Sequence, residues 1–174
     1  MKKTNHNNKA EKRMKVSFDL DEVLFVSPKT HKTEPRLPFP FYLIFRERLR
    51  LGTPRLIKEL HILGYEIWVY TSSYRSESYI RNLFKLYNVK FDGIINAQRH
   101  LREVQAGKTQ ILPQKLPNFY QISLHIDDEE VVASYGKENG FDVFQLNAQD
   151  DEWEQKIIDR VFQIQKKAIA KKLM

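Results

Sequence analysis

The stretch from residue 16 to residue 25 reads Val-Ser-Phe-Asp-Leu-Asp-Glu-Val-Leu-Phe. It begins as a short apolar run with β-branched and aromatic residues, which is typical of a buried strand. Asp19 and Asp21 follow with one residue between them. Because side chains alternate along a strand, both carboxylates can point into one crevice where the chain leaves the sheet. Carboxylates about 4 Å apart repel by roughly 4 kcal/mol at an effective dielectric constant of about 20. A pair that is kept despite this repulsion indicates a metal site or a proton-transfer site. The alternative without a chemical role is a turn or a helix cap.

Composition limits the class of protein. The chain has 174 residues, of which 41% are hydrophobic and 12% aromatic, and this fits a single globular domain with one core. It has no cysteine, so disulfides, thiolate nucleophiles and zinc–thiolate sites are excluded. No apolar run approaches the ~20 residues of a membrane span, and no apolar segment follows the N-terminal charges as it would in a signal peptide. We therefore expect a cytoplasmic protein without a membrane partner.

The charge of the chain favours anionic partners. The formal net charge is +7 at pH 7, and much of the excess lies near the two ends of the sequence. Residues 1–14 are polar, rich in Asn and Lys and aperiodic, so we predict a disordered basic leader followed by a single domain over residues 15–174. A phosphorylated substrate is the expected partner, and nucleic-acid binding through the basic termini is a further prediction.

Alternating patterns along the chain predict an α/β fold. Further strand patterns, each apolar and bounded by turn signals, are found at 66–70, 91–95, 122–126 and 141–146. Apolar stripes with the helical period lie between most of these strands and after the last one. This alternation predicts parallel β-α-β units, and hence a three-layer α/β/α sandwich around a Rossmann-like parallel sheet of about five strands. Residues 96–120 show no strong period and are predicted to be irregular or to hold one short helix.

The loop after the first strand has an unusual composition. Residues 26–40 contain four of the seven prolines of the chain. Because proline lacks a donor N–H and breaks both helices and central strands, we predict a loop beside the end of the first strand. A short apolar helix from Phe41 to about Leu49 is expected to follow.

The pattern Asp19-x-Asp21-x-Val23-Leu24 resembles the first of four signatures of the haloacid dehalogenase (HAD) superfamily. The second signature of that family is a Thr or Ser at the end of a hydrophobic strand, and Thr71 matches it. The resemblance implies a small, phosphatase-like member of the family. Asp21 argues against dehalogenase chemistry, which needs no acid to protonate an ester oxygen.

Two more signatures follow in the order expected for the HAD superfamily. The third is a Lys or Arg upstream of the fourth; Lys115 fits best, and Lys108 is the competitor. The fourth is an acidic pair after a strand, which Asp127-Asp128 resembles closely. Together the four signatures cover nearly the whole predicted domain. His125, inside the fourth strand, is expected to be packed or hydrogen-bonded rather than catalytic.

The resemblance implies a role for each of these side chains. Asp19 would attack phosphorus and form an aspartyl-phosphate. Asp21 would protonate the leaving oxygen and then take a proton from the water that hydrolyses the intermediate. Thr71 and Lys115 would hold the phosphoryl oxygens, and Lys115 would also offset the charge of the carboxylates. These roles predict a phosphoric monoester hydrolase of unknown substrate.

The resemblance also implies a Mg²⁺ ion, which prefers oxygen ligands in octahedral geometry. The expected ligands are Asp19, the backbone carbonyl of Asp21 and Asp127, with Asp128 in support. Because Lys115 offsets only part of the acidic charge, we also expect carboxylate repulsion to strain the metal-free fold. On this reasoning, Asp127→Asn would raise the melting temperature of the metal-free protein.

The spacing of the signatures bears on the substrate. About 50 residues separate the first signature from the second, too few for a large inserted cap domain beside the helix already predicted there. In this family an open site without a cap favours a macromolecular substrate or a partner that supplies the lid. A non-catalytic phosphate- or nucleic-acid-binding module on the same fold is the alternative that the sequence leaves open.

Overall fold

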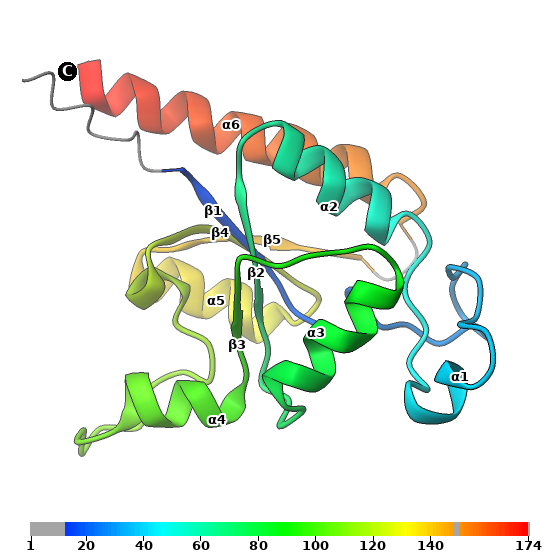
Figure 1. Cartoon of the computed structure of the whole chain (residues 1–174). Helices are drawn as coiled ribbons and strands as arrows, with labels where there is room; N and C mark the ends of the chain where they lie inside the picture. The colour runs from blue at the N-terminus through cyan, green and yellow to red at the C-terminus, as the bar shows by residue number, and fades with distance from the viewer. Residues whose placement is uncertain (1–12, 148–149, 174) are drawn as a thin grey trace, which may run out of the picture.

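Five parallel strands form one sheet in the computed structural model, which describes residues 13–147 and 150–173 (Figure 1). The strands are β1 (Lys15–Phe18), β2 (Glu66–Tyr70), β3 (Gly93–Ile95), β4 (Ile122–Asp127) and β5 (Asp142–Gln145). Their order across the sheet is β3-β2-β1-β4-β5, so β1 is the central strand. The predicted α/β fold with about five parallel strands is therefore confirmed.

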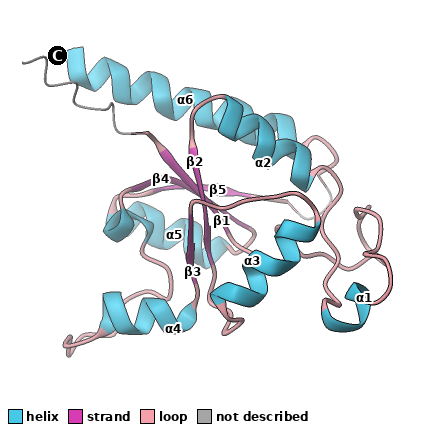
Figure 2. Ribbon diagram, viewed as in Figure 1, coloured by secondary structure: helices cyan, strands magenta, loops and turns pink. Residues whose placement is uncertain are grey.

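Helices lie on both sides of the sheet, as Figure 2 shows. They are α1 (Phe41–Ile44), α2 (Thr53–Ile62), α3 (Glu77–Leu86), α4 (Ala97–His100), α5 (Glu130–Asn139) and α6 (Trp153–Leu173). A π-helical turn, Leu101–Gln105, continues α4, and a 3₁₀ turn, Pro117–Tyr120, precedes β4. The predicted three-layer arrangement is confirmed without a large cap domain among the described residues. None of the described helices combines the length and the apolar character that a bilayer crossing requires.

The two faces of the sheet have different chemistry. On one face, apolar residues of β1, β2 and β4 pack against α2, α3 and α6 in one continuous core. Because side chains alternate along a strand, the intervening residues point to the opposite face. There Ser17, His125 and Asp127 are polar and fully buried, beside a smaller apolar cluster that includes Tyr70 and Ile95. The central strands thus present an apolar layer on one side and a polar layer on the other.

The chain reverses its direction across the sheet between β1 and β4. It runs outward from β1 through β2 to β3, and then returns to the far side of β1 to form β4 and β5. In open α/β sheets, ligands bind at such a switch point, outside the carboxyl ends of the strands. Asp19 directly follows β1 and Asp127 ends β4, and the backbone N–H of Asp19 donates to the carbonyl of Ile126 at 2.9 Å. Both acidic residues therefore lie at the switch point.

The segment after β1 folds back on itself, and we call residues 26–50 the flap. An antiparallel bridge between Phe25, the residue just before the flap, and Leu49 near its end holds the two ends of the flap together. The exposed helix α1 projects from the flap at the edge of the molecule (Figure 1). The loop predicted for residues 26–40 is confirmed, but the helix predicted to reach about Leu49 ends at Ile44.

The predicted leader lies outside the described residues except for Arg13 and Met14. The carbonyl of Met14 accepts a hydrogen bond from the backbone N–H of Glu66 at 3.0 Å, and its side chain packs against the apolar core. Among the described residues, contact between the first strand and β2 therefore begins at Met14, one residue before the predicted start of the domain.

Candidate active site

A buried lysine bridges the two acidic residues at the switch point. Lys115 Nζ lies 2.6 Å from Asp127 Oδ2 and 3.2 Å from Asp19 Oδ1. All three side chains are buried, and the exposed fraction of Lys115 is only 2%. Charged groups in a protein interior require opposite charges and hydrogen bonds around them. These three side chains therefore behave as one electrostatic unit.

His125 connects Asp127 to the central strand. Its Nε2 donates to Asp127 Oδ2 at 2.8 Å, and its Nδ1 lies 2.8 Å from the hydroxyl oxygen of Ser17. Ser17 and His125 are direct partners in the parallel register of β1 and β4, so this contact follows from strand alternation. The other oxygen of Asp127, Oδ1, accepts the backbone N–H of Glu129 at 3.0 Å. Both carboxylate oxygens of Asp127 are thus held in place, and His125 is hydrogen-bonded.

Burial and neighbouring charges act differently on the three ionisable groups. Burial would raise the pKa of Asp127, but His125 and Lys115 outweigh this effect and lower it to about 2. Burial would lower the pKa of Lys115, but the carboxylates of Asp19 and Asp127 outweigh this effect and raise it. For Asp19, burial is the largest effect and raises the pKa, although Lys115 opposes it. Asp127 and Lys115 are therefore a stable charged pair, and the charge of Asp19 is less well stabilised.

These pKa shifts correct one sequence expectation. Repulsion among the carboxylates was expected to strain the metal-free fold, so that Asp127→Asn would relieve it. The charge of Asp127 instead favours the native state, because Lys115 and His125 contact it directly. The charged forms of Asp19 and Asp128 remain disfavoured in the fold. Burial raises the pKa of Asp19. The pKa of Asp128 is raised by burial and then by the charges of Asp127 and Asp19. We now expect Asp127→Asn to lower the stability of the metal-free protein.

Three carboxylates could hold a metal ion at this position. Asp19, Asp127 and Asp128 each offer an oxygen, and these oxygens lie within 4.8 Å of one another. Oxygen ligands are those that Mg²⁺ prefers, so the donor set fits the predicted ion. Asp128 is the most accessible of the three, because it is only half-buried and Asp19 and Asp127 are buried.

Asp21 lies outside the buried cluster. Its side chain is 54% exposed, and Oδ2 accepts a hydrogen bond from Arg75 Nη1 at 2.9 Å. Asp21 belongs to the turn after β1, where Glu22 has a left-handed backbone with φ of 55°. The alternation of the strand has ended at this point. The two acids of the first signature therefore face different cations, Lys115 for Asp19 and Arg75 for Asp21.

Thr71 directly follows β2, the neighbour of β1 in the sheet. In the parallel register Phe18 pairs with Val69, so Thr71 lies level with the residues just beyond β1. Its side chain is buried, and its hydroxyl oxygen accepts the backbone N–H of Ser73 at 3.1 Å. A hydroxyl that accepts one hydrogen bond can still donate another. The hydroxyl of Thr71 can therefore still donate one hydrogen bond at the switch point.

Sequence reasoning missed the contacts that place Lys115. The backbone N–H of Leu116 donates to the hydroxyl oxygen of Tyr70 at 2.9 Å, and this hydroxyl also contacts Nδ1 of the buried His100. Lys108, the competing residue, is exposed and lies over an aromatic ring instead. The structure therefore brings Lys115, and not Lys108, to the acidic residues. The sequence signal that could have indicated this contact was weak: it is an aromatic residue with a hydroxyl, Tyr70, at the end of the second strand.

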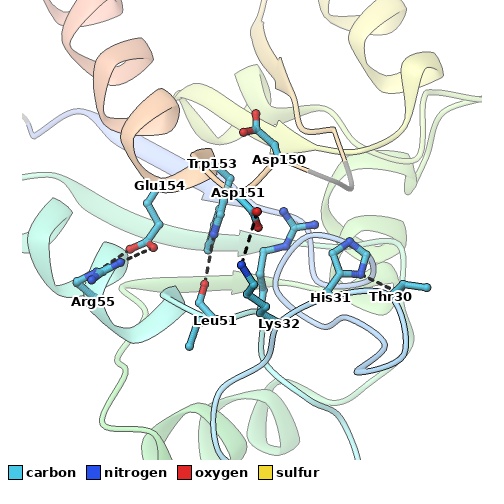
Figure 3. A pocket seen from close by; sticks show the side chains of 10 residues that line it. Thr30, His31, Lys32, Leu51, Arg55, Asp150, Asp151, Trp153 and Glu154 are labelled. Carbon is cyan, nitrogen blue, oxygen red and sulfur yellow. Dashed lines mark hydrogen bonds and ion pairs between the residues drawn. The ribbon is translucent and has the colours of Figure 1, made fainter.

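A separate cavity of about 420 Å³ lies between the flap and the start of α6 (Figure 3). Charges pair across it, because Lys32 contacts Asp151 at 3.6 Å and Arg55 contacts Glu154 at 2.7 Å. The side chains that line it in the described part of the chain do not include any predicted site residue. The predicted site residues therefore lie at the switch point of the sheet and not in this cavity.

Solved structures match this chain, whereas no protein-family model and no curated protein matches it. A HAD-superfamily hydrolase of subfamily IA from Geobacter sulfurreducens is 17% identical with a TM-score of 0.48, and the match covers 77% of this chain and 89% of that one. A predicted HAD-like family hydrolase from Porphyromonas gingivalis is 12% identical with a TM-score of 0.47, covering 86% and 98%. The HAD domain of an effector protein from Legionella pneumophila is 13% identical with a TM-score of 0.47, covering 84% and 93%. Each of the three is described as a HAD-superfamily or HAD-like protein.

Proposed function

We propose that this chain is a Mg²⁺-dependent phosphoric monoester hydrolase of the HAD type that acts through an aspartyl-phosphate. The contact of Lys115 with both Asp19 and Asp127 at the switch point is the observation that supports this function best. It brings together a nucleophilic carboxylate, a fixed cation and further carboxylates for a metal. Residues from all four signatures, which are far apart in the sequence, lie at neighbouring strand ends or contact them.

The first half-reaction transfers the phosphoryl group to Asp19. A carboxylate oxygen of Asp19 attacks the phosphorus of the bound monoester, and a new oxygen–phosphorus bond forms. The bond between phosphorus and the ester oxygen breaks, and its electron pair stays on the leaving oxygen. Asp21 donates a proton to that oxygen. The products are the alcohol, the aspartyl-phosphate and ionised Asp21.

The second half-reaction returns Asp19 to its starting state. Ionised Asp21 takes a proton from a water molecule as the water oxygen attacks the phosphorus. The bond between phosphorus and the Asp19 oxygen breaks, with its electron pair on the carboxylate. Inorganic phosphate leaves, and Asp21 is again protonated for the next cycle.

The surrounding side chains supply positive charge and hydrogen bonds. Lys115 lies 3.2 Å from Asp19, so its ammonium can stabilise the ionised nucleophile and then the phosphoryl oxygens. Thr71 has a hydroxyl donor available at the adjacent strand end. Phosphoryl transfer depends chiefly on such positioning and neutralisation of the equatorial oxygens.

The donor set of Asp19, Asp127 and Asp128 fits Mg²⁺, and the backbone carbonyl of Asp21 would complete the protein ligands. When bound, the ion supplies positive charge that neutralises the phosphoryl oxygens. Asp128 is the most accessible of these ligands, because it is only half-buried. Burial and the neighbouring carboxylates raise its pKa, so a bound cation would stabilise its charged form.

We propose a macromolecular phosphoester as the substrate. Two observations support this choice: the described residues contain no large cap domain over the switch point, and the net charge of the chain is +7. Phosphopeptides and phosphorylated oligonucleotides, compared with small phosphate esters at equal concentration, test the choice. Nucleic-acid binding through the basic termini stays a prediction, since residues 1–12 lie outside the described part of the chain.

Asp19→Asn tests the proposed reaction. We expect Mg²⁺-dependent release of phosphate by the wild type and loss of this activity in Asp19→Asn, because an amide cannot act as the nucleophile. Asp151→Asn is a matched control, because Asp151 is an exposed aspartate that contacts the surface residue Lys32 at 3.6 Å. Rates with EDTA and with Mg²⁺ measure the metal requirement. Activity retained by a pure preparation of Asp19→Asn would contradict the covalent mechanism.

Acid quenching of a reaction with a ³²P-labelled ester tests the intermediate directly. An aspartyl-phosphate should appear as protein-bound label that hydroxylamine releases, and Asp19→Asn should carry none. Phosphate binding without turnover in the wild type would instead identify the alternative, a non-catalytic phosphate- or nucleic-acid-binding module. The same preparation therefore separates the two functions.

A further inference from the structure

Arg75 stands between the flap and the proposed acid–base residue Asp21. Its Nη1 donates to Asp21 Oδ2 at 2.9 Å, and its Nε donates to Glu47 Oε1 at 3.0 Å. Glu47 belongs to the flap, and its other carboxylate oxygen accepts a hydrogen bond from the hydroxyl of Tyr79 in α3. A continuous line of side chains therefore leads from α3 through the flap to Asp21.

We infer that Arg75 and Glu47 position the carboxylate of Asp21 for proton transfer, an inference that rests on the function proposed above. Arg75 lies in the loop after β2 and Asp21 in the turn after β1, so their contact joins two of the strand ends that carry the site. The ion pair uses Oδ2 of Asp21, so we assign the proton transfer to Oδ1. A proton donor must lie within about 2.6–3.2 Å of the atom that it serves, and an exposed carboxylate needs a fixed partner to stay there.

The contacts of Arg75 favour a positioning role over phosphate binding. Two carboxylates already share its guanidinium, and Nη1 also donates to the hydroxyl of Ser73 at 2.8 Å. Its carbonyl accepts the side-chain amide of Asn96 at 2.9 Å, so the backbone is held as well. The ring of Phe25 lies 5.4 Å from the guanidinium carbon. An arginine held in this way fixes its neighbours, and two carboxylates already offset its charge.

Glu47 links the flap to the proposed acid–base residue through Arg75. Burial would raise the pKa of Glu47, but the hydrogen bond from Tyr79 and then the contact with Arg75 outweigh this effect and lower it. Glu47 is therefore ionised at neutral pH and holds the guanidinium of Arg75. A displaced flap would break this contact and leave Asp21 without a fixed partner. The flap thus controls the acid–base residue although it contains none of the four signatures.

The proton from Asp21 matters most for esters with poor leaving groups. An alkyl phosphate must release a protonated alcohol, because the alkoxide is too unstable to leave. The ester p-nitrophenyl phosphate releases a stable phenolate that needs no proton. A misplaced Asp21 should therefore slow alkyl phosphates much more than p-nitrophenyl phosphate. A change that only disturbs the fold would slow every ester by the same factor.

Arg75→Gln and Glu47→Gln test the inference, because both leave Asp21 itself intact. The logarithm of kcat/KM is plotted against the pKa of the leaving alcohol for a series of alkyl and aryl phosphates. Of the ~10²–10⁴-fold that general acid–base catalysis supplies, we expect Arg75→Gln to lose roughly tenfold or more on alkyl phosphates and less than about threefold on p-nitrophenyl phosphate. Glu47→Gln should steepen the plot less than Arg75→Gln does. Arg75→Lys keeps the positive charge and should restore part of the wild-type slope.

Arg55→Gln is the matched control, because it removes another arginine that contacts a carboxylate, Glu154, at 2.7 Å. Its plot should have the wild-type slope. Wild-type slopes in Arg75→Gln and Glu47→Gln, or equal losses on all esters, would overturn the inference. An active Asp19→Asn would instead overturn the proposed function, so the two failures are distinguishable. If Arg75→Gln does not unfold cooperatively on heating, it is not properly folded, and the slope of Glu47→Gln then decides whether the inference holds.

Discussion

Asp19 and Asp21 are two residues apart in the sequence but lie in different electrostatic environments. Asp19 faces a lysine in the interior, and the exposed fraction of that Lys115 side chain is 2%. Asp21 faces Arg75 at the surface, and its own side chain is 54% exposed. The two contacts have similar lengths, 3.2 Å and 2.9 Å. Their energies should differ, because a charge left alone in the interior has no water to replace its partner.

This difference suits the two proposed roles. A nucleophile must keep one geometry, and the buried contact of Asp19 cannot break without a large cost in free energy. An acid–base residue must release and accept a proton, and the exposed contact with Arg75 can orient the carboxylate of Asp21 without a large free-energy cost when its charge changes. The same short motif thus supplies one buried carboxylate in a fixed geometry and one exposed carboxylate whose charge can change.

Lys115→Met should have the largest effect on stability. It leaves Asp19 and Asp127 buried without their cation, and removing one partner of a buried ion pair typically costs about 3–5 kcal/mol. Urea denaturation in EDTA measures the loss. Asp21→Asn is the matched change at the exposed pair and should cost no more than about 1 kcal/mol. Equal losses in the two variants would contradict the distinction between the two environments.

Mg²⁺ should stabilise the protein through the carboxylates of Asp19, Asp127 and Asp128. A ligand that binds only the native state contributes about 2.7 kcal/mol at a hundredfold excess over its Kd. Asp128→Asn should abolish most of this gain, whereas Asp21→Asn should keep it because the expected ligand there is the backbone carbonyl. Thermal denaturation with EDTA and with Mg²⁺ at constant ionic strength measures the response. If Asp128→Asn responded like the wild type, the ion would bind elsewhere.

Acid should reveal the contribution of the Asp127 charge. Burial raises the pKa of Asp127, but His125 and Lys115 outweigh it and bring the pKa to about 2, below the ordinary value of 3.8. A lowered pKa stabilises the native state above the ordinary value, and this contribution of about 2 kcal/mol is lost as the pH falls from about 4 to about 2. Urea denaturation over this range should show a shallower decline for Asp127→Asn than for the wild type. Parallel curves would mean that the charge of Asp127 is not stabilised by folding.

The smallest effect is expected at the exposed pair. A double-mutant cycle of Asp21→Asn and Arg75→Met should give a coupling free energy of about 0.2–1 kcal/mol, which salt should reduce further. The measurement is urea denaturation of the four proteins at low and high ionic strength. A coupling of about 3 kcal/mol, the size expected for a buried pair, would remove the contrast with Lys115.

Local patterns were sufficient to predict most of the fold. The strand predicted at residues 66–70 is found at those residues, and the predicted strand at 122–126 extends by one residue to Asp127. These strands have continuous apolar patterns and clear turn signals, which depend on few distant contacts. The acidic residues of the first and fourth signatures were predictable for the same reason, because each follows such a strand.

Other parts of the site depend on contacts that no local pattern reveals. Lys108 and Lys115 lie in the same aperiodic stretch, and a hydrogen bond from Leu116 to the distant Tyr70 decides which lysine reaches the carboxylates. Arg75 carries no motif and contacts Asp21 across 54 residues of sequence. Strand alternation would have let both acids of the first signature share a crevice, but β1 ends at Phe18, before either of them.

The central position of β1 also determines when the site can form as the chain folds. On one side β1 pairs with β2, which follows after the flap and α2. On the other side it pairs with β4, and Ser17 contacts His125 across 108 residues. Contacts between residues this far apart form slowly, because a long loop must close before any of them stabilises the chain. The first three strands can therefore assemble while Asp19 still lacks Lys115 and Asp127. A chain emerging from the ribosome has its nucleophile early, but the catalytic surroundings of that nucleophile exist only after the fourth strand has docked.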